Sequence, residues 1–172
     1  MLRLRPYKKC DAKYIANWIK DERTLHQWCV DRFRFPLTGE MIAAHYDEMN
    51  DRDDFFGMTA FDNSGVVGHL FIRFADKEKK TARFGFVIVD DEKRGKGLGK
   101  EMVSLAVKYS FDILKAEKVT MGVFENNLSA YHCYKAAVFE DIILPEDEYF
   151  DIGSEKWKCL ELEYPSFKYY KS

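Results

Sequence analysis

The sequence has 172 residues, a formal net charge of −2, 47% hydrophobic residues and 16% aromatic residues. These values indicate one globular domain over residues 1–172 with a sizeable core, and they exclude a disordered chain. The near-balanced charge gives no electrostatic footprint for nucleic acid, and no apolar run is long enough to span a membrane. The cysteines are spread out and form no zinc-ligand pattern, so we expect free thiols in a cytoplasmic protein without a metal site.

The first half of the chain predicts a strand, three helices and an antiparallel meander. Residues 2–5 alternate apolar and charged side chains, which is typical of a strand. Apolar residues at helical spacing then predict three helices, which begin near Asp11, Asp21 and Thr38. Polar turns separate three further strand candidates, over residues 55–61, 66–74 and 81–89.

The second half mixes helices and strands. We expect a helix over about residues 97–114, a strand over 118–124, a helix over 128–137, a strand over 139–144, an acidic loop over 145–154 and a last strand over 157–164. Because a helix connects the strands 81–89 and 118–124, these strands should be parallel neighbours. The pattern predicts an α+β fold with a mixed, mostly antiparallel sheet of about seven strands and helices on both faces.

A glycine-rich turn over residues 94–100 lies between the strand 81–89 and the next helix. Backbone N–H groups, the positive end of the helix dipole and bare glycines make such a turn an anion-binding cradle. It is not a Walker loop, because Gly99-Lys100 is followed by Glu101 instead of Ser or Thr. The preceding antiparallel meander also argues against a Rossmann dinucleotide site.

Two motifs in this order make the interpretation more specific. Arg94-x-x-Gly97-x-Gly99 lies between the strand 81–89 and the helix over about residues 97–114, and Asn127-x-x-Ala130-x-x-x-Tyr134 follows the strand 118–124. This combination resembles the GNAT superfamily of acetyl-CoA-dependent N-acetyltransferases, and within it the branch that acts on ribosomal proteins and amino acids. The resemblance implies a parallel strand pair that splays at the cofactor site, acetyl-CoA as co-substrate, and no metal.

The resemblance also implies which residues bind acetyl-CoA. The strand before the turn pairs its backbone with the pantetheine amides, and the turn wraps the pyrophosphate. An asparagine binds the cofactor arm, although the same residue is also a good helix N-cap. Without these roles, the strand side chains would be ordinary core and the turn a solvated basic loop. The implied cofactor-binding residues are Val87, Ile88, Val89, Arg94, Gly95, Lys96, Gly97, Leu98, Gly99, Lys100 and Asn127.

For catalysis, the resemblance gives Tyr134 the role of the general acid that protonates the departing thiolate. The alternative for Tyr134 is a core aromatic with a locally bonded hydroxyl. Glu125 is the nearest candidate for a general base, and its alternative is a surface or capping carboxylate. A water chain or one of the four histidines, His26, His45, His69 and His132, could take this role instead. A backbone N–H near Val89 would stabilise the tetrahedral intermediate.

The expected acceptor is a primary amine, on a small molecule or at a protein N-terminus. The resemblance places it between the segments 28–37, 46–54 and 145–154. The acidic and aromatic loop 145–154 would favour a cationic amine, unless it is acidic only for solubility. The alternative function is a non-catalytic acyl-CoA sensor or interaction module on the same fold. Exposed strand edges make a homodimer possible, and we expect no nucleic acid or membrane partner.

Overall fold

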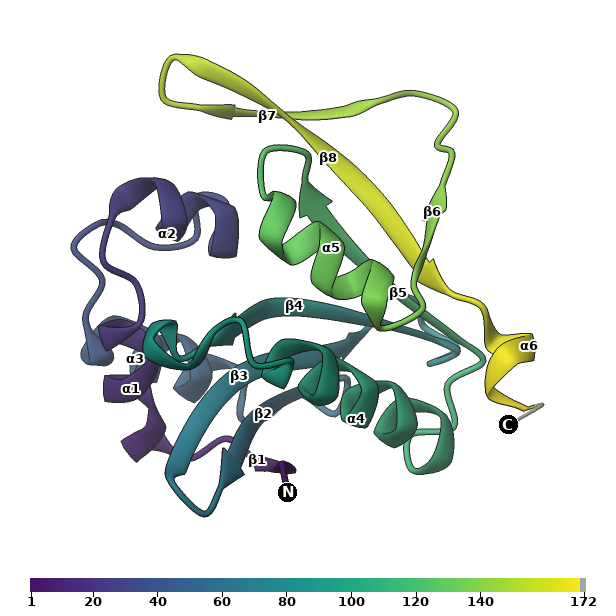
Figure 1. The fold of residues 1–172 in the computed structure, drawn as a ribbon, viewed down its shortest axis with the longest axis horizontal. Helices are drawn as coiled ribbons and strands as arrows, with labels where there is room; N and C mark the ends of the chain where they lie inside the picture. The colour runs from purple at the N-terminus through teal and green to yellow at the C-terminus, as the bar shows by residue number, and fades with distance from the viewer. Residues whose placement is uncertain (171–172) are drawn as a thin grey trace.

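The computed structural model describes residues 1–170. Its main elements follow the expected order along the chain (Figure 1). The strands are β1 (Arg3–Pro6), β2 (Phe55–Asp62), β3 (Gly65–Phe74), β4 (Thr81–Val89), β5 (Lys118–Phe124), β6 (Glu140–Ile142), β7 (Glu148–Ile152) and β8 (Glu155–Tyr164). The α-helices are α1 (Ala12–Asn17), α2 (Glu22–Cys29), α3 (Gly39–Met49), α4 (Leu98–Asp112), α5 (Leu128–Ala136) and α6 (Ser166–Tyr169).

The strands form one mixed sheet in the order β1-β2-β3-β4-β5-β8-β6, and β7 pairs with β8. The three strands β2 to β4 are antiparallel neighbours, as the hairpin turns predict, and β1 adds to them as an antiparallel neighbour of β2. β4 and β5 are parallel, and α4 lies in the connection between them. The α+β fold with a mostly antiparallel sheet is therefore confirmed.

Helices cover both faces of the sheet. α4 buries Met102, Val103, Ala106 and Val107 in the larger core, together with Phe139 after α5. The helices α1, α2 and α3 bury a second cluster against the opposite face. These two clusters follow from the amphipathic spacing of the helices, and they leave β4 between two layers.

The side-chain alternation of β4 reverses near its end. Phe84 points into the core under α4, but Phe86 and Ile88 pack against the opposite cluster, and Val87 returns to the α4 side. The pairing with β3 shifts at this point, and Phe86 has a φ of +52°. A β-bulge therefore re-aims the end of β4.

The C-terminal hairpin corrects one expectation. The region 145–154, predicted as a loop, contains the strand β7, so the sheet has eight strands instead of about seven. Phe150 and Ile152, separated by Asp151, share one face of β7 and pack with Trp157 and Phe124. The acidic composition concealed this short apolar alternation, because two inward side chains anchor the whole strand.

Candidate active site

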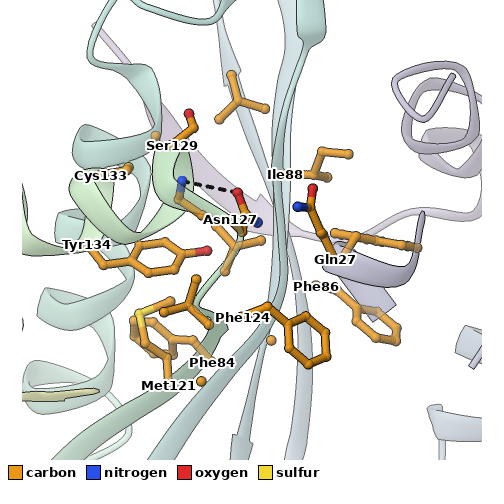
Figure 2. Close-up of a pocket in the computed structure, with 18 of the residues that line it drawn as sticks. Gln27, Phe84, Phe86, Ile88, Met121, Phe124, Asn127, Ser129, Cys133 and Tyr134 are labelled. Atoms are coloured by element: carbon orange, nitrogen blue, oxygen red, sulfur yellow. Dashed lines mark hydrogen bonds between the residues drawn. The ribbon is translucent and has the colours of Figure 1, made fainter. Parts of the chain in front are cut away.

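A cavity of about 810 Å³ lies where β4 and β5 part. The two strands pair only as far as Phe84 and Met121, although β4 continues to Val89 and β5 to Phe124. The splayed pair is therefore present, and the facing edges of the last residues do not pair with each other. Walls come from α2, α5, the turn before α4, and the hairpin of β7 and β8. Figure 2 shows Gln27 of α2 on one side of the strands and Cys133 and Tyr134 of α5 on the other.

The glycine-rich turn forms the end of the cavity at α4. Gly95 and Gly97 have φ values of +76° and +78°, a left-handed conformation that favours glycine. Gly97 is also the N-cap of α4 and has no side chain to occupy the free N–H groups of the first turn. The free N–H groups and the helix dipole favour an anion at this end.

Cationic side chains surround the turn. Arg94 and Lys100 line the cavity, and Arg94 Nε donates to the carbonyl oxygen of Val89 at 3.3 Å. Lys96, which the resemblance included, is exposed and is not part of the wall. Lys93 lines the wall instead, and its Nζ lies 2.8 Å from Ser64 Oγ. Lys93 was missed because it precedes the motif.

The start of α4 packs closely against α5. Leu98 and Gly99 both line the cavity. A Cβ added to Gly99 would lie only 2.9 Å from Cys133 Sγ, which is closer than such contacts normally occur. Glycine at this position therefore lets the turn, α4 and α5 meet around one space.

The end of β4 forms a long wall of the cavity. Val87, Ile88 and Val89, the predicted cofactor strand, all line it. Antiparallel pairing of Ile88 and Val89 with β3 occupies one edge of the strand, and no β5 residue pairs with the other edge beyond Phe84. An extended ligand arm with amide groups could pair with this free edge as an added strand.

Tyr134 reaches the cavity from α5. Its side chain is buried, with 6% of its surface exposed, and Figure 2 shows its hydroxyl pointing into the space between the strands. The hydroxyl makes no hydrogen bond to any described residue. Burial, and to a smaller degree the neighbouring Cys133, raises the pKa of Tyr134, so the phenol keeps its proton at neutral pH. Tyr134 therefore does not fit the alternative of a core aromatic whose hydroxyl is hydrogen-bonded to a neighbouring group.

Asn127 caps a helix and also lines the cavity. It is the N-cap of α5, and its side-chain oxygen accepts a hydrogen bond from the N–H of Ala130 at 3.3 Å. The same residue lines the cavity (Figure 2). The cap bond fixes the side chain at the wall and leaves its amide NH₂ as a donor.

The carboxylates of the region differ in their access to the cavity. Glu125 is exposed after β5 and is not part of the wall. Glu148 on β7 lines the wall and makes no ion pair within residues 1–170. Its position follows from the β7–β8 register, which places Glu148 opposite Cys159. In the described part of the chain, no cluster of His, Cys, Asp and Glu could hold a metal ion.

The acceptor side of the cavity is aromatic and partly cationic. Trp28 of α2 packs on Phe86 with ring centroids 4.6 Å apart. Arg73 and Arg83, from β3 and β4, also line this side. The segment 46–54, expected to contribute here, lines a separate small pocket with Tyr46, Met49 and Asn50 instead. The distance of the segment 46–54 from the gap between β4 and β5 depends on how α3 packs, and no local sequence pattern predicts this packing.

The fold and this site define an acyltransferase of known type. Residues 22–138 match the Acetyltransferase (GNAT) family, and the chain belongs to this family. It is an acetyl-CoA-dependent N-acetyltransferase, the activity that the two motifs predicted. Among residues 1–170, no helix is both long and apolar enough to cross a membrane.

Individual relatives are distant. An uncharacterized SPbeta prophage-derived N-acetyltransferase of Bacillus subtilis, YokL, is 25% identical over 129 residues, 71% of this chain and 72% of the relative. The spermidine N(1)-acetyltransferase of Vibrio cholerae is 24% identical over 139 residues, 80% of this chain and 78% of the relative. These relatives give no support to the ribosomal-protein branch.

Solved structures share the fold. A crystal structure of the Vibrio cholerae spermidine N-acetyltransferase with CoA and spermine aligns with a TM-score of 0.76 at 21% identity, over 97% of this chain and 98% of that chain. A dodecameric structure of the same enzyme aligns with a TM-score of 0.74 at 21% identity, over 98% and 95% of the two chains. At this identity the likeness establishes the arrangement of elements and no more.

Proposed function

We propose that the acetyl group passes directly from acetyl-CoA to a primary amine in the gap between β4 and β5, with Tyr134 as the general acid. The observation that carries the proposal is the hydroxyl of Tyr134, which points into the cavity without a protein partner. The amine nitrogen attacks the thioester carbonyl, the carbon–sulfur bond breaks, and the leaving thiolate takes the proton of Tyr134. The raised pKa of Tyr134 keeps that proton available at neutral pH.

The remaining residues position the donor. The turn 94–100 and the start of α4 hold the pyrophosphate, with Arg94 and Lys100 as charged partners. The free edge of Val87, Ile88 and Val89 pairs with the amides of the arm, and a backbone N–H of this segment stabilises the oxyanion. Asn127 adds a donor from its side-chain amide.

The cysteines of the wall argue for direct transfer. Burial raises the pKa of Cys29 and of Cys159 to about 11, and it also raises the pKa of Cys133. A thiol of this kind carries little thiolate at neutral pH and is a poor nucleophile. An acetyl-cysteine intermediate is therefore disfavoured, and donor and acceptor must be bound together.

Two carboxylates are candidates for the base that takes the proton from the amine. Glu125 was predicted from its place after β5, and Glu148 lines the cavity. We propose Glu148 as the stronger candidate, because a base must reach the amine directly or through one water. Glu125 is near the amine only if the bound acceptor extends beyond the wall.

A thiol-release assay tests the function. The full chain is incubated with acetyl-CoA and a panel of primary amines, which includes spermidine because the Vibrio cholerae relative is a spermidine acetyltransferase, and short peptides with free N-termini. We expect release of CoA that depends on an amine, and an acetylated amine by mass spectrometry. Tight acetyl-CoA binding without turnover over the panel would contradict transfer and favour the acyl-CoA sensor.

We also propose that residues 1–172 form one domain and that copies of the chain associate. One sheet contains strands from both halves of the chain, which supports a single folding unit. The dodecamer formed by the Vibrio cholerae enzyme supports association in a protein of this fold. Light scattering of the purified chain tests this, and a monomer at micromolar concentration would contradict it.

A further inference from the structure

Two arginines lie side by side on the acceptor side of the cavity. Arg73 of β3 is directly opposite Arg83 of β4 in the sheet, and both line the cavity wall. Residues opposite each other in an antiparallel pair point to the same face. This is the face of Gly85, where an added Cβ would meet the ring of Phe71 at 2.2 Å. The two guanidinium groups therefore belong to one region, next to the point where β4 and β5 part.

Only one of the two arginines is neutralised. Arg83 binds Glu161 with two contacts, one of which joins Nη2 to Oε2 at 3.0 Å. The other carboxylate near Arg73 is Asp54, which binds Arg52 at 2.8 Å. Arg73 itself is partly buried and makes no hydrogen bond or ion pair within residues 1–170. A partly buried cation without an anion is unfavourable, and a bound anion would remove this cost.

The surroundings of Arg73 confirm the imbalance of charge. Burial lowers the pKa of Arg73, and the nearby cations Arg83 and Arg52 lower it further. Trp28 adds a neutral donor to the same cavity, because its indole N–H is buried and has no hydrogen-bond partner among the described residues. Both groups can only donate hydrogen bonds, so a ligand group with oxygen atoms that accept hydrogen bonds fits them.

The acidic residues of the β7–β8 hairpin do not change this imbalance of charge around Arg73. Asp147 and Asp151 are ion-paired with Lys158 and Lys156, at 3.0 Å and 3.2 Å. Glu148 is the carboxylate of this hairpin that lines the cavity. The acceptor side thus presents one unpaired cation, one unpaired carboxylate and a neutralised ion pair.

We propose that the acceptor is a primary amine that also carries an anionic group, a carboxylate or a phosphate, which Arg73 binds. This inference rests on the proposed function of the cavity. The planar guanidinium of Arg73 matches either group with two parallel hydrogen bonds. Glu148 attracts the ammonium end and orients the molecule. A polycationic amine places a second positive charge near Arg73 and is disfavoured.

Three amines of equal length test the proposal: butylamine, putrescine and γ-aminobutyrate. Their binding to the CoA-saturated full chain is measured by calorimetry, and their kcat/KM by thiol release. Aminopropyl phosphate distinguishes the two anions. We expect an anionic amine to bind at least about tenfold more tightly than butylamine, and putrescine to bind most weakly.

Variants at Arg73 test whether this residue causes the preference for anionic amines. Arg73→Gln should weaken binding of the anionic amine by at least about tenfold and leave butylamine within about twofold, and Arg73→Lys should restore part of the loss. Lys108→Gln is the charge-matched control, because Lys108 is exposed on α4 and is not part of the wall. It should change none of the affinities. A thermal melt checks that each variant is folded.

The outcomes distinguish a failure of the proposed anion site at Arg73 from a failure of the proposed acetyl transfer. Selective, Arg73-dependent binding without turnover would support the anion site and contradict the transferase proposal. Turnover of putrescine or butylamine equal to that of γ-aminobutyrate and aminopropyl phosphate, or equal effects of Arg73→Gln on all four amines, would overturn the anion site. In that case transfer would stand.

Discussion

Replacing Tyr134 by phenylalanine removes one hydroxyl and leaves the buried ring in place. A positioned general acid typically accelerates a reaction by about 10²–10⁴, so a loss of about 10² in kcat corresponds to roughly 2.7 kcal/mol of transition-state stabilisation. The hydroxyl has no hydrogen-bond partner in the described structure, so its removal leaves no protein group unsatisfied. We therefore expect the free energy of unfolding to change by less than about 0.5 kcal/mol, with unchanged acetyl-CoA affinity.

The assay is thiol release with saturating acetyl-CoA and amine, supported by a single-turnover measurement so that product release does not mask the chemical step. Tyr131→Phe is the matched control, since the hydroxyl of Tyr131 is exposed and donates to Asp141 Oδ2 at 3.1 Å. This control should keep kcat within about twofold. If Tyr134→Phe also keeps kcat within about twofold in single turnover, solvent protonates the thiolate and Tyr134 is not the acid.

Three further predictions concern the turn, the base and a buried histidine. Gly97→Val should raise the Kd for acetyl-CoA, because valine is strained at a φ of +78°. Gly65→Ala, with a φ of +113° in the β2–β3 hairpin and outside the cavity wall, should lower stability without affecting that Kd. Equal binding of acetyl-CoA by the two variants in isothermal titration would contradict the cradle. Glu148→Gln should lower kcat/KM at neutral pH more than Glu125→Gln does, and the reverse order would assign the base to Glu125. Burial lowers the pKa of His69 from 6.5 to about 3, so the unfolded chain binds a proton below pH 6.5 that the folded chain does not. The contribution of His69 to the free energy of unfolding should therefore be complete above pH 6.5 and fall by up to about 1.4 kcal/mol per pH unit below it. In urea unfolding, the free energy of unfolding of the His69→Gln variant should depend less steeply on pH, and an unchanged dependence would show that His69 is not its source.

Local patterns were sufficient for most elements. The strands Thr81–Val89 and Lys118–Phe124 have the predicted limits, because both are rich in β-branched and aromatic or other apolar residues and polar segments bound them on both sides. Their parallel pairing followed from the helix between them. β7 was missed because only two apolar side chains, Phe150 and Ile152, anchor it within an acidic segment. At the exit of α5, Val138 adopts a φ of +75° where glycine would be usual, and this conformation has no signal in the sequence.

Some residues of the site could be predicted from the sequence and others could not. The turn 94–100 and Tyr134 could be identified because a motif fixes their spacing, and the structure places most of them around one cavity. Lys96 was included by its place in the motif, yet its side chain lies outside the wall. Arg73 and Glu148 could not be found from the sequence, since their place in the wall depends on the registers β3–β4 and β7–β8. Register between strands is set by packing over the whole sheet.

The most direct test of the account is a crystal structure of the full chain with CoA bound. The account predicts that the pantetheine arm lies in the gap between β4 and β5, with its amides bonded to the backbone of residues 87–89 and its pyrophosphate at the turn 94–100. The sulfur should lie within hydrogen-bonding distance of the Tyr134 hydroxyl. A cofactor outside this gap, or a sulfur directed away from Tyr134, would contradict the central claim.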